Sequence, residues 1–461
     1  MKQMTLRAVI LAIICSVFCA GLVILCCFYA AQGEDWALYP ANGHIFTNGE
    51  ITRAGNITDR NGKVLATTKN GKRVYNESET VRRATLHAVG DPYGNISTGL
   101  HNAFLSQLVG YDRLDGAYQF ADKGNDIMTT LDSEVCAAAY NALGDRKGTV
   151  GVYNYKTGEV LCMVSTPSYD VEDDDEAASA KSGKIDGVYV NRFLSSAYPP
   201  GSTFKLITAA AALDKFGDEA YTREYKCNHG VTIDGEDISC MGNHGTLTLK
   251  RALAVSCNSY FSRLAVDVGK EKLTEYAEKM GFNRAFDIDG IAAKTSYFNV
   301  KDARDIDLAW AGMGQYTNLM NPLQYLTAMG GIANGGVPVK PYFIDSIKSH
   351  IGMAVRNGKA RNGSRVLSDD IANKLADLMA SNVEINYGKW NYPGLDLCAK
   401  SGTAEVGGDK TPNAVFVGFT RNEDLPLSFV VVIENGGSGS EYGGSVANTV
   451  LQKCREVLGA K

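Results

Sequence analysis

One segment near the start of the chain limits the possible folds more than any other feature. Residues Ala8–Ala31 are 24 consecutive positions without a charged side chain. As a helix rising 1.5 Å per residue they reach about 36 Å, more than the roughly 30 Å core of a bilayer. A cleaved signal peptide is the alternative, but its apolar region is usually about 7–15 residues long. We therefore expect a single-pass membrane anchor at residues 8–31.

The charges around this segment predict its orientation. Lys2 and Arg7 precede it, and Glu34 and Asp35 follow it. Because Lys and Arg are enriched on the cytoplasmic side, we expect residues 1–7 to form a cytoplasmic tail and the rest of the chain to lie outside the cell membrane. The formal net charge is −5, and the chain has no run of basic residues, so a nucleic-acid partner has no electrostatic support.

The remaining sequence divides into two parts. Residues 32–126 are polar and rich in Gly and Asn, which predicts a small strand-rich domain near the membrane. Within it, Gly55–Thr68 is typical of a hairpin that turns at Asn61-Gly62. Residues 127–461 place strands before and after a helical block, which predicts one α/β domain with a sheet built from both ends of that segment.

Several elements of this larger domain can be placed. Gly148–Pro167 reads as two strands around a Lys156-Thr157-Gly158 turn, and a helix is expected around Leu249–Val268. The acidic stretch Asp170–Lys184 is interpreted as a solvated loop.

The first chemical motif is Ser202-Thr203-Phe204-Lys205, at the start of an apolar helix. A cation at a helix N-terminus opposes the helix dipole, and a buried helix is a costly place for it. However, residues i and i+3 share a helix face, so a hydroxyl and an amine lie side by side. Burial and the dipole both favour a neutral amine, which can accept the serine proton. The alternative is a serine cap beside an incidental surface lysine.

Two further motifs add groups of the same chemistry. Ser256-Cys257-Asn258 offers a hydroxyl that can relay protons and an amide that can hold a peptide. Lys400-Ser401-Gly402-Thr403 lies in a strand-like segment and offers a cation and two hydroxyls to a carboxylate. Gly402 would allow another backbone to approach this strand closely. Each motif alone is also compatible with ordinary caps and turns.

Together, in this order, the three motifs resemble those of the penicillin-recognising serine acyltransferases. The sequence is most similar to class B penicillin-binding proteins, and the resemblance covers nearly the whole chain. It includes RAGNITDRNGKVLA, NRFLSSAYPPGSTFK, HGTLTLKRALAVSCNSYF and GMGQYTNLMNPLQYL. It implies a transpeptidase fold of mainly antiparallel sheet flanked by helices, preceded by a transmembrane helix and a strand-rich pedestal.

The resemblance also implies residue roles in a peptidoglycan D,D-transpeptidase. Ser202 would be the acylated nucleophile, Lys205 its base and Ser256 the proton shuttle. Asn258 would bind the donor peptide, while Lys400, Ser401 and Thr403 would hold its terminal carboxylate beside Gly402. The reaction would release D-Ala, cross-link stem peptides and be blocked by β-lactams, with no cofactor or metal. A SEDS-type glycosyltransferase would be the membrane partner.

Two other functions would require sequence features that differ from these. A class A β-lactamase needs a glutamate that activates the deacylating water, and its usual Glu-x-x-x-Asn spacing does not occur between Ser256 and Asn334. A β-lactam sensor would need a cytoplasmic output domain, whereas seven residues precede the anchor.

The cysteines leave one local question open. Seven lie outside the membrane segment, an odd number that does not indicate a disulfide framework. Cys227, His229, Cys240 and His244 have a spacing compatible with zinc, with a Cys227–Cys240 disulfide, or with free thiols. Cys257 and Cys398, beside the motifs, are interpreted as packing residues.

Overall fold

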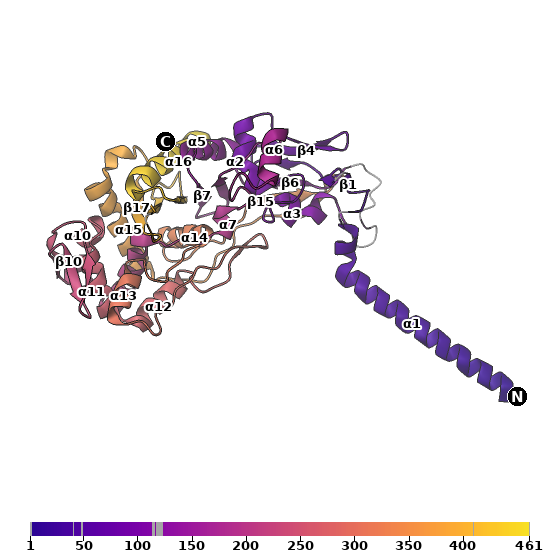
Figure 1. Ribbon diagram of the computed structural model, residues 1–461, viewed down its shortest axis with the longest axis horizontal. Helices are drawn as coiled ribbons and strands as arrows, with labels where there is room; N and C mark the ends of the chain where they lie inside the picture. The colour runs from indigo at the N-terminus through magenta and orange to yellow at the C-terminus, as the bar shows by residue number, and fades with distance from the viewer. Residues whose placement is uncertain are drawn as a thin grey trace.

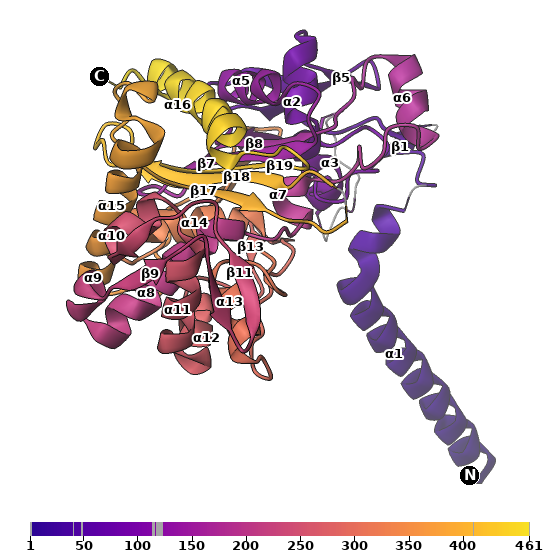
Figure 2. The ribbon, with the colours of Figure 1, turned by 60° about the vertical axis from the view of Figure 1, so that its left-hand side comes forward.

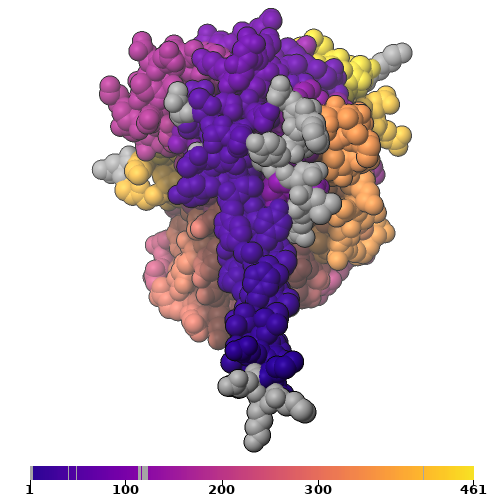
Figure 3. Space-filling model, turned by 90° about the vertical axis from the view of Figure 1, so that its right-hand side faces the viewer, coloured from indigo at the N-terminus to yellow at the C-terminus, as the bar shows by residue number. Residues whose placement is uncertain are grey.

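The computed structural model describes residues 2–39, 41–47, 49–112, 116, 123–408 and 410–460. Residues 113–115 and 117–122, in the predicted pedestal, lie outside the described residues. Helix α1 (Lys2–Ala37) projects from the body as a single rod (Figure 1). Its part Met4–Ala37 is long and apolar enough to cross a membrane, and residues 4–32 are exposed. In the space-filling view the helix runs down the face that is turned to the viewer, and its N-terminal end extends beyond the body (Figure 3). The predicted anchor therefore lies within one exposed helix.

The central sheet has five antiparallel strands in the order β17-β18-β19-β7-β8. They are β7 (Gly148–Asn154), β8 (Val160–Thr166), β17 (Leu397–Ala404), β18 (Asn413–Thr420) and β19 (Leu427–Ile433). Two strands precede the helical block and three follow it, which confirms that both ends of the segment build the sheet. The turn between β7 and β8 places Gly158 at φ +85°, as the predicted hairpin requires.

Helices cover both faces of this sheet (Figure 2). On one side lie α5 (Ser133–Leu143) and α16 (Gly444–Leu458). On the other side α14 (Pro322–Ala333) packs against β18 and β19, with α15 (Asp369–Asn382) and α7 (Arg192–Ser195) nearby. Because both faces are covered, β8, β18 and β19 are buried along their whole length. Their sequences are therefore mostly apolar at successive positions instead of alternating between apolar and polar residues.

A helical lobe extends from the sheet around α8 (Lys205–Phe216). Its other members are α9 (Glu219–Thr222), α10 (Leu249–Ala254), α11 (Asn258–Val268), α12 (Lys270–Lys279) and α13 (Asp305–Gly312). In α8 every residue from Lys205 to Leu213 is buried. The prediction of one helix over 249–268 was wrong. The helical conformation is interrupted between α10 and α11, where Ser256 has φ +53°.

A second sheet lies in the part of the body nearest α1 (Figure 1). Its strand order is β16-β15-β6-β3-β4-β5, with β3 and β6 parallel and the other pairs antiparallel. The strands are β3 (Ile57–Thr58), β4 (Val64–Lys69), β5 (Lys72–Tyr75), β6 (Asp126–Thr129), β15 (Ile344–Lys348) and β16 (Ala354–Asn357). The hairpin at Asn61-Gly62 is confirmed, with Gly62 at φ +80°. Helices α2 (Glu79–Val89), α3 (Leu100–Ala103) and α4 (Leu105–Leu108) and the pair β1 (Phe46–Thr47) and β2 (Glu50–Ile51) accompany it.

The acidic stretch after β8 is more ordered than expected. Instead of a solvated loop it contains helix α6 (Asp174–Lys181), which Asp173 caps through its carboxylate. Asp170 is buried and forms an ion pair of 2.6 Å with Arg82 of α2. Carboxylates at a helix start are favoured by the dipole, and a distant arginine compensates the buried charge. The arginine partner could not be inferred from the local sequence.

Candidate active site

Ser202 lies in a tight turn that introduces the buried helix α8. The turn, η1 (Gly201–Phe204), is a 3-10 helix, so Ser202 precedes the α-helix and Lys205 is the first residue within it. Gly201 adopts φ +53°, a conformation that glycine reaches without a steric cost. The Thr203 hydroxyl donates a hydrogen bond of 2.7 Å to the carbonyl oxygen of Pro200. The Pro-Pro-Gly sequence thus fixes where the helix begins.

Two glycines allow neighbouring backbones to hold this turn. A Cβ atom on Gly402 of β17 would lie 2.6 Å from the carbonyl oxygen of Pro200, which confirms the close approach predicted at that glycine. On the other side, Gly201 donates its N–H to the carbonyl oxygen of Gly314 at 3.0 Å, and a Cβ on Gly314 would lie 1.9 Å from the Gly201 carbonyl oxygen. Gly314 lies in the family-like stretch GMGQYTNLMNPLQYL, but its contact with Gly201 was not predicted.

Lys205 is fully buried, and its amine faces the second motif. Its Nζ atom donates hydrogen bonds to the carbonyl oxygen of Ser256 at 2.8 Å and to Oδ1 of Asn258 at 2.7 Å. Burial lowers the pKa of this lysine from 10.5 to about 8, against the opposing influence of Cys257 and Cys240. A substantial fraction of the amine is therefore neutral near pH 7–8 and able to accept a proton.

Ser256 joins the first and third motifs. Its Oγ atom lies 3.3 Å from Nζ of Lys205 and 3.0 Å from Nζ of Lys400. The residue has φ +53° in the break between α10 and α11, a conformation that costs a non-glycine residue roughly 1–2 kcal/mol. This unusual backbone turns the hydroxyl between two amines, an arrangement suited to passing a proton from one to the other.

Lys400 enters the site from the sheet. It is fully buried in β17, and its Nζ atom also donates to the carbonyl oxygen of Ser401 at 2.9 Å. Its pKa is held well below the usual value, first by burial and then by the positive charge of Lys205. Two buried amines that share one hydroxyl titrate as a pair, and the site does not favour charging both.

Asn258 is the first residue of α11 and is oriented by three contacts. Its Oδ1 accepts from Lys205, its Nδ2 donates to the carbonyl oxygen of Ser239 at 3.1 Å, and its N–H donates to Sγ of Cys240 at 3.3 Å. The side chain is only partly buried. The amide is thus fixed at the edge of the site, where a peptide group can reach it.

The third motif presents its side chains along β17. Ser401 is partly buried and Thr403 is exposed, on either side of Gly402. The hydroxyl of Tyr387 donates to Oγ of Ser401 at 2.8 Å and accepts from the Ser401 N–H at 2.7 Å. Since Ser401 Oγ already accepts from Tyr387, its own hydrogen remains available for a substrate. Tyr387 was not predicted as a site residue, because it lies in the short π-helix η2 (Val383–Tyr387), outside all three motifs.

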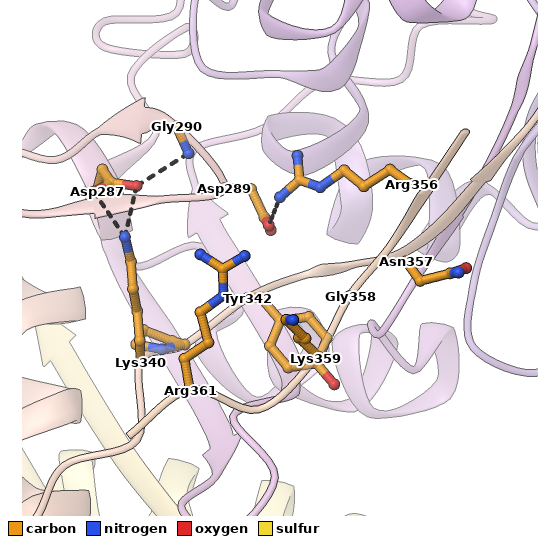
Figure 4. A pocket seen from close by; sticks show the side chains of 11 residues that line it. Asp287, Asp289, Gly290, Lys340, Tyr342, Arg356, Asn357, Gly358, Lys359 and Arg361 are labelled. Carbon is orange, nitrogen blue, oxygen red and sulfur yellow. Dashed lines mark hydrogen bonds and ion pairs between the residues drawn. The ribbon is translucent and has the colours of Figure 1, made fainter. Parts of the chain in front are cut away.

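A polar cavity elsewhere in the molecule has a different character (Figure 4). It is lined by Asp287, Asp289, Lys340, Arg356 and neighbouring residues, none of which belongs to the three motifs. Lys340 pairs with Asp287 at 2.9 Å, and Arg356 forms an ion pair with Asp289. These pairs tie the hairpin of β13 (Asp287–Ile288) and β14 (Ile291–Ala292) to the 340–361 segment. Compensated charges of this kind indicate a structural contact.

Comparison with known proteins points to one family. The model of the penicillin binding protein transpeptidase domain matches residues 148–456, which include all three motifs. A peptidoglycan D,D-transpeptidase PbpA of Mycolicibacterium smegmatis is 30% identical over 387 residues, covering 77% of this chain and 78% of the relative. Stage V sporulation protein D of Bacillus subtilis is 28% identical over 350 residues, covering 71% of this chain and 52% of that relative.

Solved structures agree with this assignment. Penicillin-binding protein A from M. tuberculosis, in a ceftriaxone acyl-enzyme complex, superposes with a TM-score of 0.78 at 26% identity and covers 87% of this chain and 98% of that chain. The D,D-transpeptidase domain of a peptidoglycan glycosyltransferase from Eggerthella lenta superposes with a TM-score of 0.77 at 28% identity and covers 89% and 100% of the two chains.

Proposed function

The chain belongs to the penicillin-binding protein transpeptidase family, and from this premise we infer that Ser202 carries the acyl group during its reaction. The enzyme is a serine-type peptidoglycan D,D-transpeptidase that β-lactams acylate. The alternatives of a β-lactamase and a β-lactam sensor are not favoured by these relatives.

The observation that supports the assignment most strongly is the hydroxyl of Ser256 between two buried amines. Lys205 contacts it from α8 and Lys400 from β17, and the turn that holds Ser202 leads directly into α8 and packs against β17. Burial of an amine lowers its pKa and costs folding free energy, and groups with such shifted pKa values cluster at functional sites. We propose that this arrangement is a proton path, with Lys205 as the base for Ser202.

The acylation step follows from these groups. The neutral amine of Lys205 takes the proton of Ser202, and Oγ attacks the carbonyl carbon of the penultimate D-Ala. The backbone N–H groups of Ser202 and Thr403 would stabilise the oxyanion. The C–N bond then breaks, and the departing amine of D-Ala receives a proton through Ser256. In the second half, an acceptor amine attacks the ester, loses a proton to the same relay and releases Ser202 with its proton restored.

Recognition of the donor peptide is assigned to the groups around β17. Lys400 and the hydroxyls of Ser401 and Thr403 would bind the terminal carboxylate, and Asn258 would hold the peptide amide. Gly402 lets the Pro200 carbonyl approach β17 closely and so holds the turn of Ser202 beside this strand. Tyr387 acts as a positioning residue, because it orients the hydroxyl of Ser401.

Labelling of the full-length protein in detergent with a fluorescent penicillin tests the assignment. Peptide mapping should place one adduct on Ser202, and Ser202→Ala should abolish it. Ser195→Ala is the matched control, because Ser195 is exposed and only seven positions earlier, so it should label like the wild type. An adduct on another residue, or undiminished labelling of Ser202→Ala, would contradict the proposal.

We also propose the cellular arrangement of the chain. Residues 1–7 would be cytoplasmic and 8–31 would span the membrane, with a pedestal at 32–126 and a transpeptidase domain at 127–461 outside. A SEDS-type glycosyltransferase would contact the anchor and pedestal. The unburied apolar helix α1 supports the anchor. Periplasm-specific and cytoplasm-specific reporter fusions at both termini test the topology, and cross-linking in intact membranes tests the partner.

A further inference from the structure

Three cysteines and one histidine converge beside the Ser256–Asn258 turn. The Sγ atoms of Cys227, Cys240 and Cys257 and one ring nitrogen of His244 all lie within 4.8 Å of one another. Among the described residues this is the one group of three or more His, Cys, Asp or Glu side chains so arranged. Cys227 and Cys257 are buried, and Cys240 is half-buried. The cluster is thus a compact set of soft ligands inside the protein.

Four separate elements supply these side chains. Cys227 ends β9 (Tyr225–Cys227) and Cys240 follows β11 (Glu236–Ser239), which pairs with β10 (Gly230–Ile233). His244 precedes β12 (Gly245–Leu247), which pairs with β9, and Cys257 is the N-cap of α11. One bound ion would therefore connect two small β-ladders to the helix that begins with Asn258.

The interatomic distances match those of a tetrahedral zinc centre. With Zn–S bonds of about 2.3 Å and Zn–N bonds of about 2.05 Å, tetrahedral geometry separates two sulfurs by about 3.8 Å and sulfur from nitrogen by about 3.6 Å. The Sγ atoms of Cys240 and Cys257 are 3.9 Å apart. Nδ1 of His244 lies 3.5 Å from Sγ of both Cys227 and Cys240. Little movement would be needed to place an ion at the centre.

The surroundings of the sulfur atoms fit metal-bound thiolates. Each sulfur faces a hydrogen-bond donor: the Ser259 hydroxyl at 3.3 Å from Cys227, the Asn258 N–H at 3.3 Å from Cys240, and the Tyr260 N–H at 3.4 Å from Cys257. Donors of this kind stabilise the negative charge of ligating sulfur and orient the ligand. A disulfide would use only two of the three sulfurs, so it would not account for the third sulfur or for the histidine beside it.

We propose that Cys227, Cys240, His244 and Cys257 bind a structural zinc ion. Four protein ligands leave no open position, so the ion would have no catalytic role. The set revises two sequence interpretations, because Cys257 joins the cluster and His229 does not. Cys257 separates Ser256 from Asn258, so the ion would hold the strained turn that positions both residues against Lys205.

Metal analysis of the full-length protein, purified in detergent under reducing, oxygen-free conditions, tests this proposal. We expect about one zinc ion per chain in the wild type and less than about a tenth of that in Cys227→Ser and in His244→Ala. His229→Asn is the matched control, because His229 is an exposed histidine of the same loop with φ +56°, a conformation that asparagine tolerates. It should retain the full zinc content.

Cobalt substitution keeps the test decisive if a ligand variant does not fold. Wild-type protein exchanged into Co²⁺ should show the thiolate-to-cobalt charge transfer and intense visible bands of a tetrahedral centre. Three results would overturn the proposal. They are wild-type protein that holds no zinc after addition of one equivalent and dialysis, folded ligand variants that keep their zinc, and a Cys227–Cys240 disulfide in protein alkylated before cell lysis.

Discussion

Lys400 donates a hydrogen bond of 3.0 Å to the hydroxyl of Ser256, a residue 144 positions away along the chain. The lysine lies on the edge strand β17 of the central sheet, and the serine lies in the break between two helices of the lobe. This bond spans the junction between sheet and lobe, at the point where the turn of Ser202 is also held. The site is therefore assembled only when both layers are in place.

Removal of the Ser256 hydroxyl should slow acylation without preventing folding. In Ser256→Ala the two amines lose the group that connects them, so proton delivery to the leaving nitrogen is impaired. We expect the second-order rate constant of penicillin acylation to fall by about 10²- to 10⁴-fold, the usual contribution of a positioned acid–base group. Stopped-flow labelling measures it, with Ser195→Ala as the unaffected control. An unchanged rate would exclude Ser256 from the proton path.

The pH dependence of the acylation rate constant should report the pKa of the two buried amines. The proposed base, Lys205, must be neutral to accept the serine proton, and burial lowers its pKa to about 8. The rate constant should therefore rise with pH, about tenfold per unit below pH 7, and level off above roughly pH 8–9. Because Lys400 interacts with Lys205, the midpoint belongs to the pair. A profile that is flat between pH 6 and 9 would contradict a lysine base.

The same burial predicts how stability depends on pH. Lys205 has a lower pKa in the folded protein than in the unfolded chain, so the unfolded chain binds more protons between about pH 8 and 10.5. The contribution of this lysine to the free energy of unfolding should therefore rise across that window and be least favourable below it. Lys205→Met should remove this contribution, which denaturant titrations of wild type and variant at pH 7 and pH 10 can compare.

Tyr387→Phe should weaken the binding of a substrate carboxylate more than it slows the acylation step itself. The variant keeps the ring but loses the hydroxyl that orients Ser401. We expect acylation by a penicillin to slow by about tenfold, as for a lost hydrogen bond of about 1.4 kcal/mol. Acylation by the corresponding methyl ester should change little. Tyr392→Phe is the control, since Tyr392 is a buried tyrosine that stacks on Phe416. Equal slowing with both substrates would argue against the positioning role.

Gly402→Ala should both destabilise the protein and displace Ser202, the proposed nucleophile. The added methyl group would lie 2.6 Å from the carbonyl oxygen of Pro200, so β17 or the turn of Ser202 must shift. Overpacking of this kind costs about 1–3 kcal/mol of unfolding free energy. Thermal denaturation should show a lower Tm and labelling a slower rate. Gly43→Ala, where a Cβ would meet nothing within 4 Å, should leave both unchanged.

Much of the fold follows from local patterns. The apolar segment 8–31, the hairpins at Asn61-Gly62 and Lys156–Gly158, and the sheet strands at both ends of the domain could be predicted because period, length and turn residues act over a few positions. The break at Ser256 could not, since a positive φ at serine is imposed by its distant neighbours. Helix α6 was missed for a similar reason, because Arg82 and Arg83 of α2 compensate its acidic stretch.

Each motif carries its reactive groups at short, fixed spacings, so the proposed chemistry could be predicted from the sequence. How those groups meet depends on the tertiary structure. It places Lys205 and Lys400 on one hydroxyl, adds Tyr387 to Ser401, and selects Cys257 over His229 for the cysteine cluster. Such contacts join residues that are far apart in the chain, so they depend on how the sheet and the lobe pack and on which side chains that packing buries.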